Sequence, residues 1–184
     1  MKIYRIDFDF GSYQSFDQHF EDTSTAQELD EKLHKISVLT HCRSVAGIWT
    51  PPEVYSARPK LKRPDFWKFS LYNTFAMSSI TIRNVQHFVE KSGELLPFRY
   101  KGEAFHVLNV LEYANYRIFS ENVPGHLHQE NIEGKIPTSI FRDTDRVYLY
   151  VAERTGNPAT EFKAYVESEQ MTGLTFHKTW DSNR

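Results

Sequence analysis

Two segments of the chain follow one plan, in which an amphipathic helical pattern ends at a glycine and an apolar stretch follows immediately. In the first segment, apolar residues recur at helical spacing, Ser79 is a candidate N-cap and Gly93 ends the pattern. In the second, Asn157 can cap the helix, Pro158 takes its first position and Gly173 ends it. Because each helix leads directly into a candidate strand, this plan favours a mixed α+β domain.

The other expected elements are mostly strands. Alternating apolar residues predict a first strand over 2–10, with Phe10 on the same face as Ile6 and Phe8. The pair Lys101-Gly102 is typical of a hairpin turn between two strands. The candidate strands later in the chain are 66–77 (one strand or two), the two arms of the hairpin over 94–111, 116–119 and 145–153.

A third helix is expected over 22–36, where Ser24 or Thr25 can cap it. Four prolines over 49–64 favour an irregular connection there, and 121–135 has the polar composition of a long loop. A chain of 184 residues has the length of one domain. The sequence therefore predicts a single α+β domain with about three helices and a mixed or mainly antiparallel sheet, with an N-terminal subdomain as the alternative.

The charges are unevenly distributed. The segment 6–31 contains eight acidic residues and no lysine or arginine, whereas the rest of the chain carries all 22 basic residues against the remaining 16 of the 24 acidic ones. We therefore divide the chain into an acidic strand–helix part over 1–48 and an α+β part over 49–184. A segment of one sign steers partners of the opposite charge. We expect a partner to bind at Glu21, Asp22, Glu28, Asp30 and Glu31; the alternative is a solvated helix face.

Several features predict a cytoplasmic location. The first ten residues include one lysine, one arginine and two aspartates, and they lack the apolar run of a secretory signal. No apolar stretch reaches the length of a membrane span, so we expect no membrane contact. The single cysteine, Cys42, cannot form an intramolecular disulfide and fits a reducing compartment.

Three groups of side chains could in principle bind a metal. His126, His128 and Glu130 alternate on a glycine-flanked segment, and two pairs of carboxylates have the same spacing, Asp7 with Asp9 and Asp143 with Asp145. No second set of ligands and no glycine-rich phosphate loop accompanies them. We expect no metal site and no cofactor, although the sequence leaves open whether the histidine pair with Glu130 ever holds a metal.

The chain shows no catalytic motif. Cys42 follows His41 directly, and neighbouring residues on a strand point to opposite faces, which is poor geometry for an activated thiolate. We expect no catalytic residues and no enzymatic activity. The alternative is a small hydrolase or transferase with a dispersed active site that uses Asp7, Asp9, His126 or His128.

One stretch, 58–69, interleaves basic and aromatic residues in the way that single-stranded nucleic acids are held. The overall pI near 6.4 lacks the basic footprint of a nucleic-acid domain, so we expect no nucleic-acid partner. The chain also contains 14 Phe, 10 Tyr and 3 Trp. Tyrosine and tryptophan are enriched at protein–protein interfaces, although aromatic residues fill cores as well.

A pattern over 49–180 resembles a known family. It combines RPDFWKF, a helix from Ser79, ELLP at 94–97, FHVLNVL, IFRDTDRVYLYVAE and a closing GLTFHKTW. This combination resembles the bacterial polymorphic-toxin immunity proteins of the eleventh Imm family. The resemblance implies a non-enzymatic cytoplasmic antidote that binds a cognate toxin domain, and it leaves self-association open. Of the matched residues, we expect Gly173 to adopt a left-handed helix end, Pro97 to lie at a sheet edge and Phe176 to belong to the core, and Leu96 likewise to serve the fold.

Overall fold

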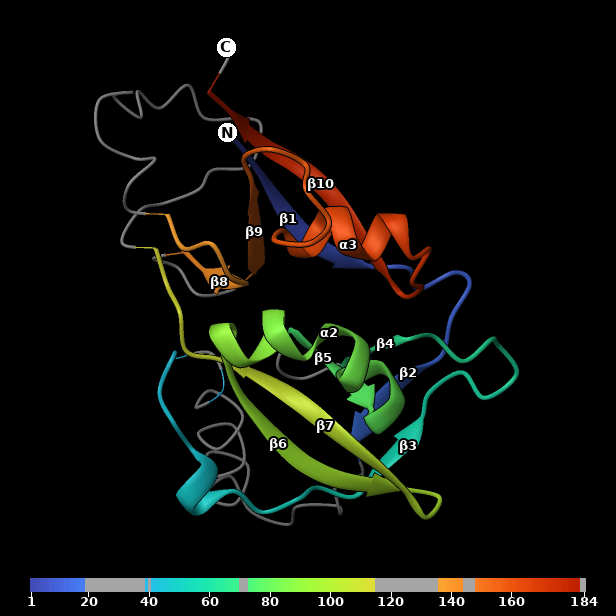
Figure 1. Ribbon diagram of the computed structural model, residues 1–184. Helices are drawn as coiled ribbons and strands as arrows, with labels where there is room; N and C mark the ends of the chain where they lie inside the picture. Colours follow the sequence, from blue (N-terminus) through green and yellow to red (C-terminus); the bar gives the residue numbers. More distant parts are fainter. Residues whose placement is uncertain (19–38, 40, 70–72, 115–135, 144–147, 183–184) are drawn as a thin grey trace, which may run out of the picture.

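The computed structural model describes residues 1–18, 39, 41–69, 73–114, 136–143 and 148–182, and within them two β-sheets pack together with α-helices between them (Figure 1). The first sheet has four strands, all antiparallel, in the order β10–β1–β9–β8. Its strands are β1 (Lys2–Phe8), β8 (Phe141–Arg142), β9 (Leu149–Glu153) and β10 (Leu174–Asp181).

The second sheet has six strands in the order β3–β2–β4–β5–β7–β6. Only β2 and β4 pair in parallel, so the sheet is mixed. Its strands are β2 (Ser15–Gln18), β3 (Val54–Ser56), β4 (Phe66–Phe69), β5 (Thr74–Ser78), β6 (Gly93–Tyr100) and β7 (Glu103–Val110). The predicted irregular connection over 49–64 thus contains the short strand β3.

The described residues contain two α-helices, α2 (Ser79–Ser92) and α3 (Phe162–Ser168), and one short 3-10 helix, η1 (Ala46–Ile48). The predicted α+β class is confirmed. The predicted number of about three helices is higher than these two, and the helix expected over 22–36 lies outside the described residues, as do the expected loop 121–135 and strand 116–119. No helix among the described residues is long and apolar enough to cross a membrane.

One hydrophobic core joins the two sheets into a single domain. Its buried side chains come from β1 and β9 on one side, from β4, β5 and β7 on the other, and from both α-helices. Phe162 of α3 is central, because its ring lies 5.7 Å from Phe66 of the six-stranded sheet, 5.8 Å from Phe88 of α2 and 6.4 Å from Phe176 of β10. Residue 48 is the predicted boundary between the acidic part and the α+β part of the chain. Each sheet contains one strand from before this residue, β1 in the four-stranded sheet and β2 in the six-stranded sheet, and its other strands come from after it.

The first strand is shorter and more two-sided than its sequence pattern predicts. Ile6 and Phe8 enter the main core as expected, but β1 ends at Phe8 and Phe10 is 43% exposed. Ile3 is buried on the opposite side, in a second cluster with Phe141. Ile3 lies an odd number of positions from Ile6, so strand alternation alone places apolar residues on both faces of β1. The pairing with β10 also shifts between Ile3 and Tyr4.

Both ends of α2 differ from the prediction: the N-cap lies one residue earlier, and Gly93 ends the helix for a different physical reason. Ser78, not Ser79, is the N-cap, and its Oγ accepts the backbone N–H of Thr81. Gly93 ends the helix with an extended backbone, φ 167°, rather than a left-handed one. The glycine is required because a Cβ there would lie 1.9 Å from the carbonyl oxygen of Asn109 on β7.

The second predicted helix is much shorter than the segment 157–173. The side chain of Asn157 accepts the N–H of Ala159 in a separate turn, and α3 begins only at Phe162. Gly173 adopts the left-handed conformation as predicted, φ 101°, but several residues after the helix ends. A Cβ at Gly173 would also lie 2.1 Å from the carbonyl oxygen of Phe66, so this glycine permits the close approach of the two sheets.

The hairpin of β6 and β7 is confirmed. Lys101 and Gly102 both have positive φ, which is typical of the two-residue turn that matches strand twist. Strand β6 forms an edge of its sheet with Pro97 exposed on it, as expected, and Leu96 is buried. Phe176 packs on the main core but is only partly buried.

Candidate functional site

Most of the side chains predicted to carry function fall outside the part of the chain that the structure describes. This holds for the five acidic partner-binding candidates, Glu21, Asp22, Glu28, Asp30 and Glu31, and for His126, His128, Glu130 and Asp145. These predictions stay untested, so the candidate site must be built from the remaining residues.

The two described carboxylates of the first pair serve local structure. Asp7 accepts two hydrogen bonds from the Arg5 guanidinium, at 2.7 and 2.9 Å, and lies 3.5 Å from His177 Nε2. Asp9 accepts the backbone N–H groups of Gly11 and Ser12, as an aspartate does when it stabilises a turn. Among the described residues, no three His, Cys, Asp or Glu side chains gather as ligands for one metal ion.

Asp143 and Cys42 lie near the most buried charge of the described chain, Arg142. Burial lowers the pKa of the Arg142 guanidinium to about 10, although the nearby Cys42 and Asp143 oppose this effect. Asp143 accepts a hydrogen bond from the Tyr150 hydroxyl, and burial followed by the charge of Asp143 raises the pKa of Tyr150. Asp143 is therefore a buried residue that stabilises the fold.

The basic–aromatic stretch divides into buried rings and surface cations. Phe66 is buried in the main core, and Trp67 and Phe69 are buried in a further cluster with Phe16 and Phe105, so these rings cannot stack on bases. Arg63 forms a bidentate pair with Glu103, at 3.0 and 2.6 Å. Two cations of this stretch contact an exposed aromatic ring among the described residues: Lys68 of β4 and Arg58, which follows β3.

That ring is Phe10, and with Arg58 and Lys68 it forms what we call the Phe10 surface. Lys68 Nζ lies 4.1 Å from the centre of the Phe10 ring, and the Arg58 guanidinium lies 6.0 Å from it. Arg58 also donates a hydrogen bond to the carbonyl oxygen of Phe10. An exposed cation–π contact of this kind stabilises by about 0.5–1 kcal/mol, so two of them hold the ring in one place.

The electrostatics of this surface are mixed. Burial lowers the pKa of Lys68, and Arg58 acts in the same direction, whereas Asp17 and Asp7 oppose it. The charges of Asp7 and Asp17 therefore lie within reach of the Lys68 ammonium. The three residues of the Phe10 surface come from β4, the segment after β1 and the segment after β3, and Asp17 of the neighbouring β2 acts on Lys68.

Sequence reasoning missed Phe10, because the alternating pattern over 2–10 predicts a buried face that includes it. The sequence does single out the stretch 58–69, which contains Arg58 and Lys68, but it offers the aromatic residues of that same stretch as their neighbours and predicts no nucleic-acid partner. Nothing in the local sequence shows where β1 ends, and only that end exposes the Phe10 ring.

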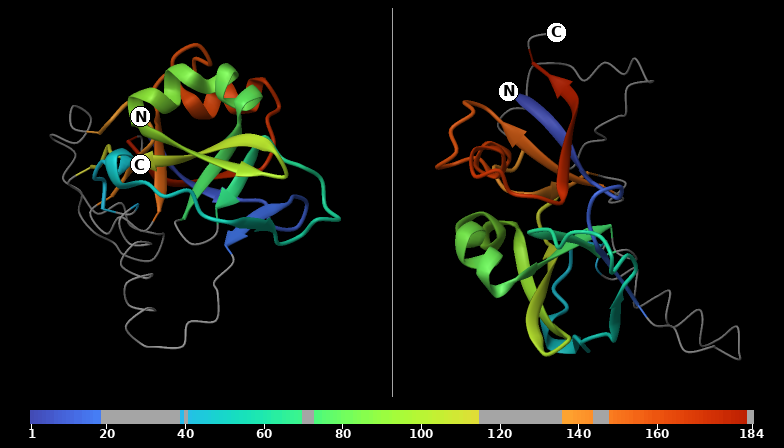
Figure 2. Two further views of the ribbon diagram at one scale, coloured as in Figure 1. Left: turned by 90° about the horizontal axis from the view of Figure 1, so that it is seen from below. Right: turned by 90° about the vertical axis from the view of Figure 1, so that its right-hand side faces the viewer.

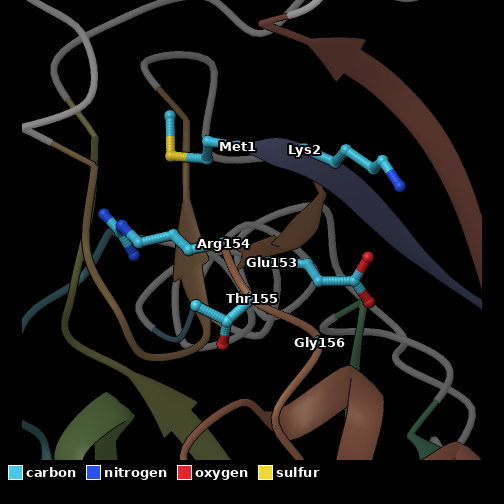
Figure 3. A pocket seen from close by; sticks show the side chains of 6 residues that line it. All are labelled: Met1, Lys2, Glu153, Arg154, Thr155 and Gly156. Carbon is cyan, nitrogen blue, oxygen red and sulfur yellow. The ribbon is translucent and has the colours of Figure 1, made fainter.

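A depression of about 230 Å³ lies at the end of β9, lined by Met1, Lys2, Glu153, Arg154, Thr155 and Gly156 (Figure 3). Two of its charged side chains, Glu153 and Arg154, bond within the fold. Glu153 accepts hydrogen bonds from the Tyr4 hydroxyl and Lys163 Nζ, and Arg154 donates to the carbonyl oxygen of Ile136. Beside it, the buried Glu161 carboxylate accepts the backbone N–H groups of residues 154–156, which outweighs its burial and lowers its pKa. Glu153, Arg154 and Glu161 therefore stabilise the fold around the depression.

Comparisons with known proteins add no relative: no protein-family model, no curated protein and no solved structure matches this chain.

Proposed function

We propose that this chain is a cytoplasmic immunity protein, which binds a cognate bacterial toxin domain and neutralises it by covering it rather than by catalysing a reaction. The resemblance over 49–180 supports the family, and the Phe10 surface supports a mode of action by protein–protein contact.

The observation that carries the proposal is the position of Phe10. Aromatic and arginine side chains dominate the energy of protein interfaces, particularly where a rigid ring is held before binding. Phe10 is 43% exposed and is held by Lys68 and Arg58. Ile80 of α2 is 66% exposed, and no cation of the described residues lies against it, so it serves as a control position.

The acidic candidates remain a separate part of the proposal. Strand β2 ends at Gln18, and the segment with Glu21, Asp22, Glu28, Asp30 and Glu31 follows it in the chain. Under this proposal the acidic segment accelerates association with a basic toxin surface, and the Phe10 surface contributes most of the affinity once contact is made.

The test uses the toxin domain encoded by the neighbouring reading frame, with binding measured by calorimetry and protection measured by growth on co-expression. We expect Phe10→Ala and Arg58→Ala each to weaken binding by about 2 kcal/mol, roughly 30-fold. The first substitution removes the ring, and the second removes a cation that holds the ring in place. Ile80→Ala should bind like the wild type. Charge reversal at the five acidic positions should slow association, most clearly at low salt.

Two outcomes would contradict the proposal. Full affinity in both Phe10→Ala and Arg58→Ala would show that the Phe10 surface is not the interface. Failure of the wild-type chain to bind this toxin domain or to restore growth would remove the immunity function itself.

A further inference from the structure

The edge strands of the two described sheets are β3, β6, β8 and β10, and they differ in how readily they could pair with a strand of another chain. Strand β3 has three residues and β8 has two, too few to offer a long edge. Strand β6 has eight residues, but it contains Pro97, and the segment 44–49 lies against it. Trp49 Nε1 donates to the Pro97 carbonyl oxygen, and Ser44 and Val45 donate to the Glu94 carboxylate.

Strand β10 is the exception among the described edges. It has eight residues and no proline, and its pairing among the described residues is with β1 alone. Figure 2 (right) shows the molecule from the side on which β10 borders its sheet. The pairing shift opposite Ile3 and Tyr4 interrupts the strand near Thr179, so the regular part of this edge is 174–178.

The direction of the backbone groups follows from the register. The N–H of Asp9 bonds to the carbonyl oxygen of Gly173, and hydrogen-bonded pairs alternate with non-bonded pairs along an antiparallel ladder. Thr175 and His177 therefore direct their N–H and C=O groups toward β1. Leu174, Phe176 and Lys178 direct theirs toward the outer edge.

We propose that this edge pairs with β10 of a second copy of the chain, antiparallel and about a two-fold axis at Phe176. Each Phe176 then donates its N–H to the carbonyl oxygen of the partner's Phe176, and the two four-stranded sheets become one continuous sheet. Leu174 faces the partner's Lys178, and Thr175 faces the partner's His177.

Self-complementarity favours a second copy as the occupant. In this register no two like charges stand opposite each other, and the two phenylalanines form a cross-strand aromatic pair. Phe176 already rests against Phe162 within its own subunit, so its ring is positioned before pairing. The net charge of −2 offers little repulsion between copies. A pairing of five residues is a small interface, and the dimer is accordingly one that depends on protein concentration.

The test is the mass of the full chain in solution, measured by sedimentation over a wide range of concentration. We expect the mass to rise from 21.6 kDa toward twice that value. Lys178→Pro should abolish the rise, because proline removes an outward N–H while the bonds between β10 and β1 remain. Lys178→Ala is the matched control: it loses the same side chain and its 3.3 Å contact with Asp181 but keeps the N–H, so it should still dimerise.

Thermal unfolding of the two variants at low concentration checks that both subunits fold alike. A wild-type chain that stays monomeric, or a dimer that persists in Lys178→Pro, overturns the proposal. Hydrogen exchange of the Phe176 and Lys178 amides adds a third arm: protection that appears only with the toxin domain bound would assign the edge to that partner and likewise overturn a second copy. None of these outcomes depends on the Phe10 surface.

Discussion

At the scale of single residues, two glycines show that the same residue type is required for different reasons. Gly102 has a φ of 82° and open space around it, so its backbone conformation alone selects glycine. Gly93 has an ordinary extended backbone, but a Cβ there would collide with the Asn109 carbonyl group. The colliding atom belongs to the β7 backbone and cannot move aside as a flexible side chain could.

We therefore expect Gly93→Ala to lower the free energy of unfolding by about 1–3 kcal/mol, the usual cost of overpacking a well-packed site. A Cβ added at Gly47 would meet no atom within 4 Å, and Gly47 has no positive φ, so Gly47→Ala should change the same quantity by less than about 0.5 kcal/mol. Urea unfolding followed by circular dichroism measures both. Equal stability of the two variants would mean that α2 and β7 separate readily at this point.

At the scale of elements, hydrogen bonds join the two sheets between the residue before β4, Asp65, and Thr172, which lies two residues before β10. Asp65 donates its N–H to Thr172 Oγ1, and the Asp65 carboxylate accepts both the N–H and the hydroxyl of Thr172, each at 2.8 Å. Phe66 also donates its N–H to the Thr172 carbonyl oxygen. This reciprocal set joins segments that are 107 residues apart in the chain.

A double-mutant cycle tests whether the tie acts as a unit. We expect Thr172→Val and Asp65→Ala each to destabilise the fold by about 1–2 kcal/mol, since each leaves hydrogen-bonding groups of the other residue unsatisfied. The double variant should lose less than the sum, by at least about 0.5 kcal/mol. Thr175→Val, at an exposed position nearby, is the control. Strict additivity in urea unfolding would show that the two residues act independently.

At the scale of the whole molecule, the main core between the sheets makes stability a shared property, and pH acts on that stability through a partly buried imidazole. His106 lies on β7 with a partly buried ring, and its Nδ1 has no hydrogen-bond partner among the described residues. Burial lowers the pKa of His106 below its usual 6.5. The unfolded chain therefore binds a proton at a pH where the folded chain does not, so the stability that the neutral ring provides is lost as the pH falls below 6.5.

We expect the free energy of unfolding of the wild type to fall on acidification from pH 6.5, before the carboxylates with a reference pKa of 4.5 begin to titrate. His106→Gln should reduce this slope. Chemical unfolding at a series of pH values measures the difference. A slope that is the same in both proteins would assign the acid sensitivity to other groups.

Much of the fold was predictable where the signals are local. Helix α2, the hairpin of β6 and β7 and the strands β4 and β5 all follow from residues within a few positions of one another. The length of α3 was not predictable in this way, because the polar contacts around Glu161 and the turn at Asn157 replace the first part of the expected helix. The Phe10 surface was not predictable either, since it combines positions 10, 58 and 68 from separate strands and connections.

By itself, the sequence determined the α+β class and the approximate places of most strands and of α2, because hydrophobic periodicity and turn residues act over short distances. The tertiary structure alone decided which strands share a sheet, why Gly93 must be glycine, and which aromatic side chain stays exposed. Those outcomes depend on strand pairing and on backbone contacts between residues far apart in the chain, and no local pattern encodes either of them.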